Sequence, residues 1–237
     1  MTDLPGVSLP ELARGDLGVF GALVFGLWPA AHHGCWAELL QSDTERLLLI
    51  APPGHAKSTW CTVIYPAWLI GRRPDVNILL VSATAAQALL FSGAVRATVS
   101  ASAEYRQVFP AITPDRKRGW SAAAWYVVRS TGANKDATVA AYGVGGPLIG
   151  RRADVIIVDD PCDDATTATA ARRDKLWRWY RQTLLTRLRP GGRIIVVMTR
   201  WHPDDLAGRL ISTGEYTTCH MEAISADTEV SAEIIRN

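Results

Sequence analysis

The sequence lacks a Cys-x-x-Cys pair, a strong charge of either sign, and a continuous apolar run long enough to cross a membrane. Its four cysteines, Cys35, Cys61, Cys162 and Cys219, stand far apart, which argues against a zinc knuckle and gives no disulfide framework. A reducing compartment is therefore expected. The 25 Lys and Arg residues nearly balance 23 Asp and Glu residues, which excludes a histone-like polycation and a disordered acidic chain.

Residues 17–31 are uncharged, but this stretch is only 15 residues long. A membrane-spanning helix needs roughly 20 apolar residues. A secretory signal is also disfavoured, because residues 1–16 carry three acids and one base, whereas a signal begins with basic residues. We therefore predict a core helix here and no association with a membrane. With 237 residues, 48% of them hydrophobic, the chain can bury a substantial core.

Apolar runs alternate with helical segments along the chain. Strands are predicted at 46–51, 76–82, 154–158 and 193–198. Helices are predicted at 57–69, 85–99, 167–188 and 204–211. Residues 125–129 and 137–142 flank the segment GANKD and predict a hairpin or two adjacent strands. The alternation predicts an α/β fold with a mainly parallel sheet and helices on both faces.

The first motif that indicates chemistry is APPGHAKST at residues 51–59, between a buried strand and a helix. This context is typical of a P-loop, whose backbone N–H groups hold phosphates at a helix N-terminus. The loop keeps one glycine, because alanine stands at 51 and 56 where the pattern has glycine. A simple strand–turn–helix corner is the alternative. The residues expected to bind nucleotide are Pro53, Gly54, His55, Ala56, Lys57, Ser58 and Thr59.

The second motif, DVIIVDD at residues 154–160, ends a predicted strand on two acids. Ligands bind at this edge of open parallel sheets. We expect Asp159 to hold Mg²⁺ together with the Ser58 hydroxyl, and Asp160 to orient or deprotonate the attacking water. Alone, the acids could merely cap the next loop. Together with the first motif they predict a Mg²⁺-dependent nucleoside triphosphatase.

Two further motifs supply groups that could sense or stabilise phosphate. The segment MTRWHPDDL at 198–206 follows another buried strand, so Thr199 and Arg200 are expected at the same sheet edge. Residues 143–152 carry four glycines before Arg151 and Arg152, which predicts a mobile loop with an arginine finger. A plain surface turn is the alternative for this loop.

These motifs, in this order, resemble the ATPase half of the large terminase subunit of tailed bacteriophages, which packages DNA. The resemblance implies a P-loop NTPase of the additional-strand, RecA-like type. It assigns Lys57 and Ser58 to Walker A, Asp159 to Walker B, Asp160 to catalysis, and Thr199 with Arg200 to a motif that couples hydrolysis to DNA movement. Many relatives carry an arginine within the Walker A loop, which this chain lacks. Charge compensation is then expected from Arg151, Arg152 or Arg200.

The resemblance also implies the setting in which the chain works. It implies ATP and Mg²⁺ as cofactors, double-stranded DNA as substrate, and a homo-oligomeric ring. The ring would dock on the portal protein of a prohead in the host bacterial cytoplasm, with a small terminase subunit as partner. Residues 1–45 are expected as a helical lead-in, 46–212 as the ATPase core, and 213–237 as the start of a linker toward a nuclease domain. Nuclease activity is not expected from this chain.

Charge is concentrated at residues 172–193, where eight bases stand against one acid. Lys175, Arg178 and Arg181 are expected to project outward from a helix and to contact DNA phosphates without reading bases. A solvated helix face is the ordinary alternative. His32 and His33 precede the P-loop strand without metal-ligand spacing, so no zinc site is predicted, and the adenine contacts stay unassigned. Two other functions stay open: a helicase-like DNA-dependent ATPase, and a degenerate nucleotide-binding assembly module.

Overall fold

The computed structural model describes residues 7–130, 134–148, 150–221 and 232–235. The helices are α1 Leu9–Gly15, α2 Leu17–Phe25, α3 Ala31–Gln41, α4 Tyr65–Arg72, α5 Ala85–Ala101, α6 Ala103–Val108, α7 Asp164–Thr167, α8 Ala170–Trp179 and α9 Leu206–Thr213. The strands are β1 Arg46–Ile50, β2 Ile78–Ser82, β3 Ala124–Trp125, β4 Val139–Gly143, β5 Ala153–Asp159, β6 Leu188–Met198, β7 Thr217–Met221 and β8 Ala232–Ile235.

The strands form one sheet in the order β3-β4-β2-β5-β6-β1-β7-β8. From β4 to β7 all neighbours run parallel, while β3 and β8 pair antiparallel at the two edges. One strand, β6, lies between the strand that precedes the P-loop motif, β1, and the strand that ends on the two acids, β5. This inserted strand is the defining feature of the additional-strand class, so the predicted fold class is confirmed.

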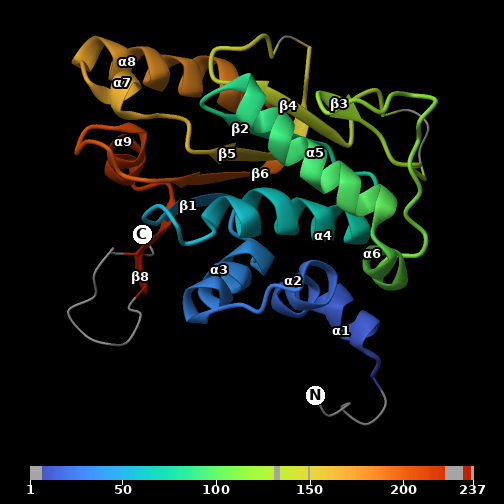
Figure 1. Ribbon diagram of the computed structural model, residues 1–237. Coiled ribbons are helices and arrows are strands. Elements are labelled where there is room, and N and C mark those ends of the chain that lie inside the picture. The colour runs from blue at the N-terminus through green and yellow to red at the C-terminus, as the bar shows by residue number, and fades with distance from the viewer. Residues whose placement is uncertain (1–6, 131–133, 149, 222–231, 236–237) are drawn as a thin grey trace.

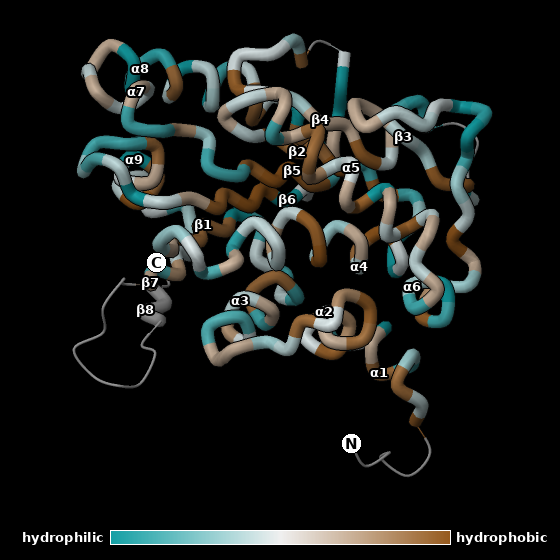
Figure 2. Tube along the Cα trace, viewed as in Figure 1, coloured by the Kyte–Doolittle hydropathy of each residue, from teal (hydrophilic) through white to brown (hydrophobic). Residues whose placement is uncertain are grey.

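Each central strand contributes side chains to two separate cores, one on each face of the sheet. In β1, Leu47 and Leu49 belong to one core, while Leu48 and Ile50 belong to the other. Continuous apolar strands are required because both faces are covered. In Figure 1, α7, α8 and α9 lie on one side of the sheet, and α4 with the N-terminal helices lies on the other. Figure 2 shows the most hydrophobic part of the chain along the central strands.

The N-terminal helices pack onto the same core as the helix that follows the motif at 51–59. Leu17 and Phe20 of α2 and Trp36 of α3 are fully buried in the core that contains Trp60, just after the P-loop. The helical lead-in is thus part of the domain. Within the range 213–237, predicted as the start of a linker, β7 pairs with β1 from Leu47 to Ile50 and β8 pairs with β7.

Two predicted helices differ from the observed ones. The helix after the P-loop motif runs from Lys57 through a π-helical segment, Thr59–Ile64, into α4. The helix predicted over 167–188 is divided: α7 and α8 are separate, a π-helical segment Tyr180–Leu184 follows, and β6 begins at Leu188. The strand thus begins at the last residue of the predicted helix, five residues before the predicted strand start at 193.

Candidate nucleotide-binding site

The loop after β1 has the geometry of a phosphate-binding turn. Gly54 has φ 85° and Ala56 has φ 55°, so both lie in the left-handed region. Glycine adopts this conformation without strain, whereas a left-handed residue with a side chain costs about 1–2 kcal/mol. The helix starts directly after Ala56, at Lys57. The loop therefore presents a free helix N-terminus, whose N–H groups and dipole attract anions.

The Lys57 ammonium is buried beside the second acid of β5. Its side chain is 9% exposed, and Nζ lies 2.9 Å from Asp160 Oδ2. A buried ammonium needs a partner, because an unpaired charge is costly to desolvate. In this structure the partner is the Asp160 carboxylate. Phosphate oxygens carry the same negative charge and would pair with the ammonium in the same way.

Asp159 lies deeper, at 2% exposure, and receives two hydroxyl hydrogen bonds. Ser58 Oγ donates to Asp159 Oδ1 over 2.9 Å, and the Thr62 hydroxyl donates to Oδ2. Burial raises the pKa of Asp159 to about 6, although the hydrogen bond from Thr62 opposes the rise. Thr62 was missed by sequence reasoning, because within an apolar helix it resembles a core residue. Its position four residues after Ser58, on the same helix face, is the signal that could have found it.

Asp160 is held in a strained conformation at the end of β5. Its φ is 39°, which is uncommon for a residue with a side chain and is typical of functional sites. The Asp160 N–H donates to the Val197 carbonyl over 2.8 Å, and Oδ1 accepts a 2.7 Å hydrogen bond from the Thr199 N–H. The Thr199 hydroxyl reaches the Ala51 carbonyl at 3.4 Å. Three motifs that are far apart in the sequence thus meet in one hydrogen-bonded group.

The oxygen donors at this group suit a hard divalent cation. The Ser58 hydroxyl and the Asp159 carboxylate are adjacent, and Mg²⁺ prefers one or two protein oxygens with water and phosphate oxygens. Among the described residues no group of three or more His, Cys, Asp or Glu side chains could hold a metal by itself. The residues present therefore fit a magnesium ion that arrives with a triphosphate.

The structure does not bring Arg151 or Arg152 to this group. Arg151 Nε donates to the Tyr142 hydroxyl on β4 over 3.0 Å. Arg152 is exposed, and its Nη1 donates to the Thr186 carbonyl over 3.3 Å. Tyr142 lies two strands from β5 in the sheet, and Arg152 stands seven residues before Asp159, about 23 Å along an extended strand. Both guanidinium groups are thus hydrogen-bonded to residues other than the phosphate-binding loop and the two acids.

Arg200 organises its own loop and does not point freely toward phosphate. Nε lies 3.3 Å from Asp205 Oδ1, and Nη2 donates to the carbonyls of His202 and Pro203. Asp205 is fully buried, caps α9 through the Gly208 N–H, and accepts a further hydrogen bond from the Trp201 N–H. This loop is built as a rigid connection between Thr199 and α9, and the sensing role expected for Arg200 has no support in its contacts.

The surface of α8 and the following turn carries the cations predicted to contact DNA. We call Lys175, Arg178 and Arg181 the basic face; all three are exposed, while Leu176, Tyr180 and Leu184 are buried. Other bases of this segment are engaged internally. Arg173 binds Asp204, and Arg189 binds Asp136 and Asp154. The net positive charge of this segment's surface is thus smaller than the sequence suggests. The three cations of the basic face remain exposed to solvent.

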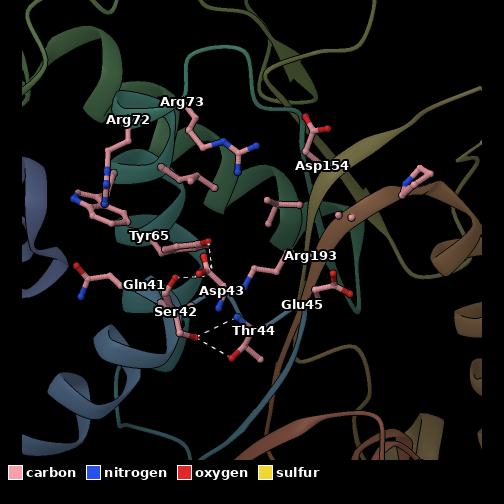
Figure 3. Close-up of a pocket in the computed structure, with 17 residues that line it drawn as sticks. Gln41, Ser42, Asp43, Thr44, Glu45, Tyr65, Arg72, Arg73, Asp154 and Arg193 are labelled. Atoms are coloured by element: carbon pink, nitrogen blue, oxygen red, sulfur yellow. Dashed lines mark hydrogen bonds between the residues drawn. The ribbon is translucent and has the colours of Figure 1, made fainter.

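A pocket of about 450 Å³ lies at the amino ends of the central strands, away from the carboxyl ends that carry the candidate site (Figure 3). It is lined by residues that precede β1, by α4 and the residue after it, and by the first parts of β5 and β6, among them Asp43, Arg73, Asp154 and Arg193. Arg193 is occupied there by the Leu39 and Leu40 carbonyls at the end of α3. Because the phosphate-binding loop follows the carboxyl end of β1, this pocket is separate from the candidate site.

Comparison with known proteins gives one informative relative. The chain is 28% identical over 210 residues to the large terminase subunit of Enterobacteria phage T3, a match that covers 85% of this chain and 35% of the relative. The chain is similar to large terminase subunits. The resemblance predicted from the motifs is thus confirmed, and the chain spans about a third of that relative's length.

Other comparisons add little to this similarity. No family model matches. Among solved structures, the large terminase ATPase domain of Thermus phage P74-26 matches with 19% identity and a TM-score of 0.48, over 75% of this chain and 67% of that one. No helix in the described ranges has the length and apolar character needed to cross a bilayer.

Proposed function

We propose that this chain is the ATP-hydrolysing motor domain of a phage terminase large subunit, which drives double-stranded DNA into proheads. The observation that carries the proposal is the hydrogen-bonded group formed by Lys57, Ser58, Asp159, Asp160 and Thr199 at one sheet edge. The similarity to the phage T3 subunit supports the biological setting.

The triphosphate would bind at the helix N-terminus after β1, with the Lys57 ammonium on its outer phosphates. Lys57 would exchange its ion pair with Asp160 for phosphate oxygens, which frees the Asp160 carboxylate. Ser58 and Asp159 would hold Mg²⁺, which neutralises charge on the phosphates when bound. The Thr199 N–H keeps Asp160 oriented throughout.

Asp160 would act as the base in the hydrolytic step. Water attacks the γ-phosphorus in line, the bond to the β,γ-bridging oxygen breaks, and the water proton passes to the Asp160 carboxylate. ADP leaves with the bridging oxygen, and inorganic phosphate is the second product. The contact between Asp160 and Thr199 would relay the change at the phosphate to the loop before α9.

An arginine finger would come from a neighbouring subunit. In their own subunit Arg151 and Arg152 are hydrogen-bonded to Tyr142 and Thr186, which supports a role for them across an interface. This fits the ring that the resemblance implies. The proposed partners are the portal protein, a small terminase subunit and double-stranded DNA on the basic face, with the ring docked on a prohead in the host cytoplasm.

One observation favours a second candidate, a nucleotide-binding assembly module without turnover. Ala56 occupies a left-handed position that favours glycine, which reduces the freedom of the loop to rearrange around phosphates. Measured ATP turnover with and without double-stranded DNA decides between the two. DNA-stimulated hydrolysis without unwinding of a forked duplex supports the motor, whereas tight nucleotide binding without hydrolysis supports the module.

A further inference from the structure

His33 on α3 makes one hydrogen bond at the start of its own helix and one to the phosphate-binding loop. The Ala30 N–H donates to His33 Nδ1 over 3.1 Å, at the start of α3. His33 Nε2 lies 3.0 Å from the His55 carbonyl in the loop. Because a carbonyl only accepts, Nε2 must carry a proton, and because Nδ1 accepts, it must not. The two contacts together specify a neutral imidazole with its proton on Nε2.

The ring of His33 is also fixed from the other side of the loop. It stacks on Trp60 with centroids 5.1 Å apart and an interplanar angle of 24°. Trp60 is 1% exposed and stands three residues after Lys57. A Cβ added to Gly21 would lie 2.6 Å from the Trp60 ring, so α2 packs against that ring without space to spare. His33 therefore contacts the loop from a rigid support.

The His55 carbonyl stands at the most strained part of the loop. It belongs to the peptide that joins His55 to Ala56, between left-handed Gly54 and left-handed Ala56. In a planar trans peptide the C=O and N–H point in opposite directions. A carbonyl held toward α3 therefore turns the Ala56 N–H away from α3. Ala56 is strained in this left-handed conformation, whereas glycine would not be. A hydrogen bond from outside the loop therefore contributes more to holding this peptide in place.

We propose that His33 is a positioning residue for ATP, whose neutral ring holds the His55–Ala56 peptide so that the loop presents its N–H groups to phosphate. The inference rests on the proposed function, because it assumes that this loop binds a triphosphate. His33 itself makes no contact with the reacting atoms. Protonation of Nδ1 would remove the acceptor for Ala30 and place a positive charge at the N-terminus of α3, which its dipole disfavours.

The surroundings of His33 favour its neutral form. Burial lowers its pKa below the ordinary value near 6.5, the contact with the His55 carbonyl raises it, and the His55 ring lowers it again. Within the described residues, the titratable groups that face it are His32 on α3 and His55 in the loop, while the helix after the loop offers the uncharged Trp60. The hydrogen bond from the Ala30 N–H to Nδ1 is therefore intact at neutral pH and is lost as the pH falls through the lowered pKa, while Nε2 keeps its proton.

The test compares His33→Leu with His33→Gln. Leucine keeps bulk but makes neither hydrogen bond, whereas glutamine can accept from Ala30 and donate to His55 without titrating. At pH 7.5 the Kd for Mg·ATP, measured by calorimetry, should rise about tenfold in His33→Leu and stay within about threefold of wild type in His33→Gln. Turnover at saturating ATP should change less than about twofold in both.

The pH dependence of the Kd for Mg·ATP is the measurement that a merely structural role of His33 would leave unchanged. Wild-type Kd should rise below pH 6.5 by more than that of His33→Gln, so the difference between the two profiles isolates His33 from other groups. Unchanged affinity in a folded His33→Leu protein, or identical profiles for wild type and His33→Gln, would overturn the inference. If the wild-type protein binds no ATP at all, both the proposed function and the inference about His33 fail.

A spectroscopic readout keeps the inference testable if His33→Leu does not fold. The ¹⁵N shifts of the wild-type imidazole report which nitrogen carries the proton at pH 7.5. A neutral ring protonated on Nε2 supports the assignment, and a ring protonated on Nδ1 or on both nitrogens contradicts it.

Discussion

Asp159→Asn should stabilise the protein without nucleotide while it removes the metal ligand. Burial raises the pKa of Asp159 from 3.8 to about 6, and each pH unit is worth about 1.4 kcal/mol. The ionised carboxylate therefore costs the folded state about 3 kcal/mol above pH 6. Asparagine keeps the shape, and its side-chain oxygen can still accept from Ser58 or Thr62, but it carries no charge.

The sign of the pH dependence follows from the raised pKa. Below pH 3.8 Asp159 is protonated in both folded and unfolded chains, so it costs nothing there. The cost develops as the pH rises from about 4 to 6 and is complete above that range. The advantage of Asp159→Asn over wild type should therefore be about 0.5 kcal/mol at pH 4 and about 3 kcal/mol at pH 7.5.

Urea unfolding at pH 4, 5, 6 and 7.5 without Mg²⁺ measures this difference directly. Asp43→Asn is the matched control, since Asp43 is exposed and its loss should change the free energy of unfolding by less than about 0.5 kcal/mol. Adding Mg²⁺ and a non-hydrolysable ATP analogue should stabilise wild type and not the variant. An Asp159→Asn protein that is less stable than wild type at pH 7.5 would refute the reasoning, because the hydroxyl hydrogen bonds would then outweigh desolvation.

Three further predictions follow from the loop, the basic face and the displaced arginines. Ala56→Gly should raise the free energy of unfolding by about 1 kcal/mol, measured by urea unfolding, because it relieves the left-handed backbone; a loss of stability would contradict this. Changing the basic face to glutamine should weaken DNA binding and reduce its log–log salt slope by about 2 to 3, and an unchanged slope would remove this surface from the DNA path. Mixing Arg151→Ala/Arg152→Ala protein with Lys57→Ala protein should restore ATPase activity, whereas no rescue would reject a finger in trans.

The sequence predicted the sheet and the place of the candidate site, because the apolar strands are followed by residues of the three motifs. The runs before Ala51, Asp159 and Thr199 are buried strands, and parallel order brings their carboxyl ends together. The start of β6 could not be predicted, because Pro190 and the two glycines after it resemble a turn. In the structure the strand passes through them, with Gly191 at φ 68°.

Other features depend on contacts between distant segments. β7, whose sequence is TTCHM, has too little apolar character to predict a strand, and it forms because β1 offers an open edge. The sites of Arg151 and Arg152 depend on where the glycine-rich loop returns to the sheet, which local sequence does not specify. The contact of His33 with the loop likewise depends on how α3 packs against the helix after the P-loop.

Steady-state ATP hydrolysis by wild type and Asp160→Asn tests the central claim most directly. Wild type should hydrolyse ATP in the presence of Mg²⁺ and double-stranded DNA. Asp160→Asn should lose about 10²-fold or more in turnover while it still binds Mg·ATP, because asparagine cannot accept the water proton. Asp164→Asn, an exposed acid four residues further on, should retain wild-type turnover. Near-wild-type hydrolysis by Asp160→Asn, or no hydrolysis by wild type under these conditions, would contradict the assignment of this group as a nucleotide-hydrolysing site.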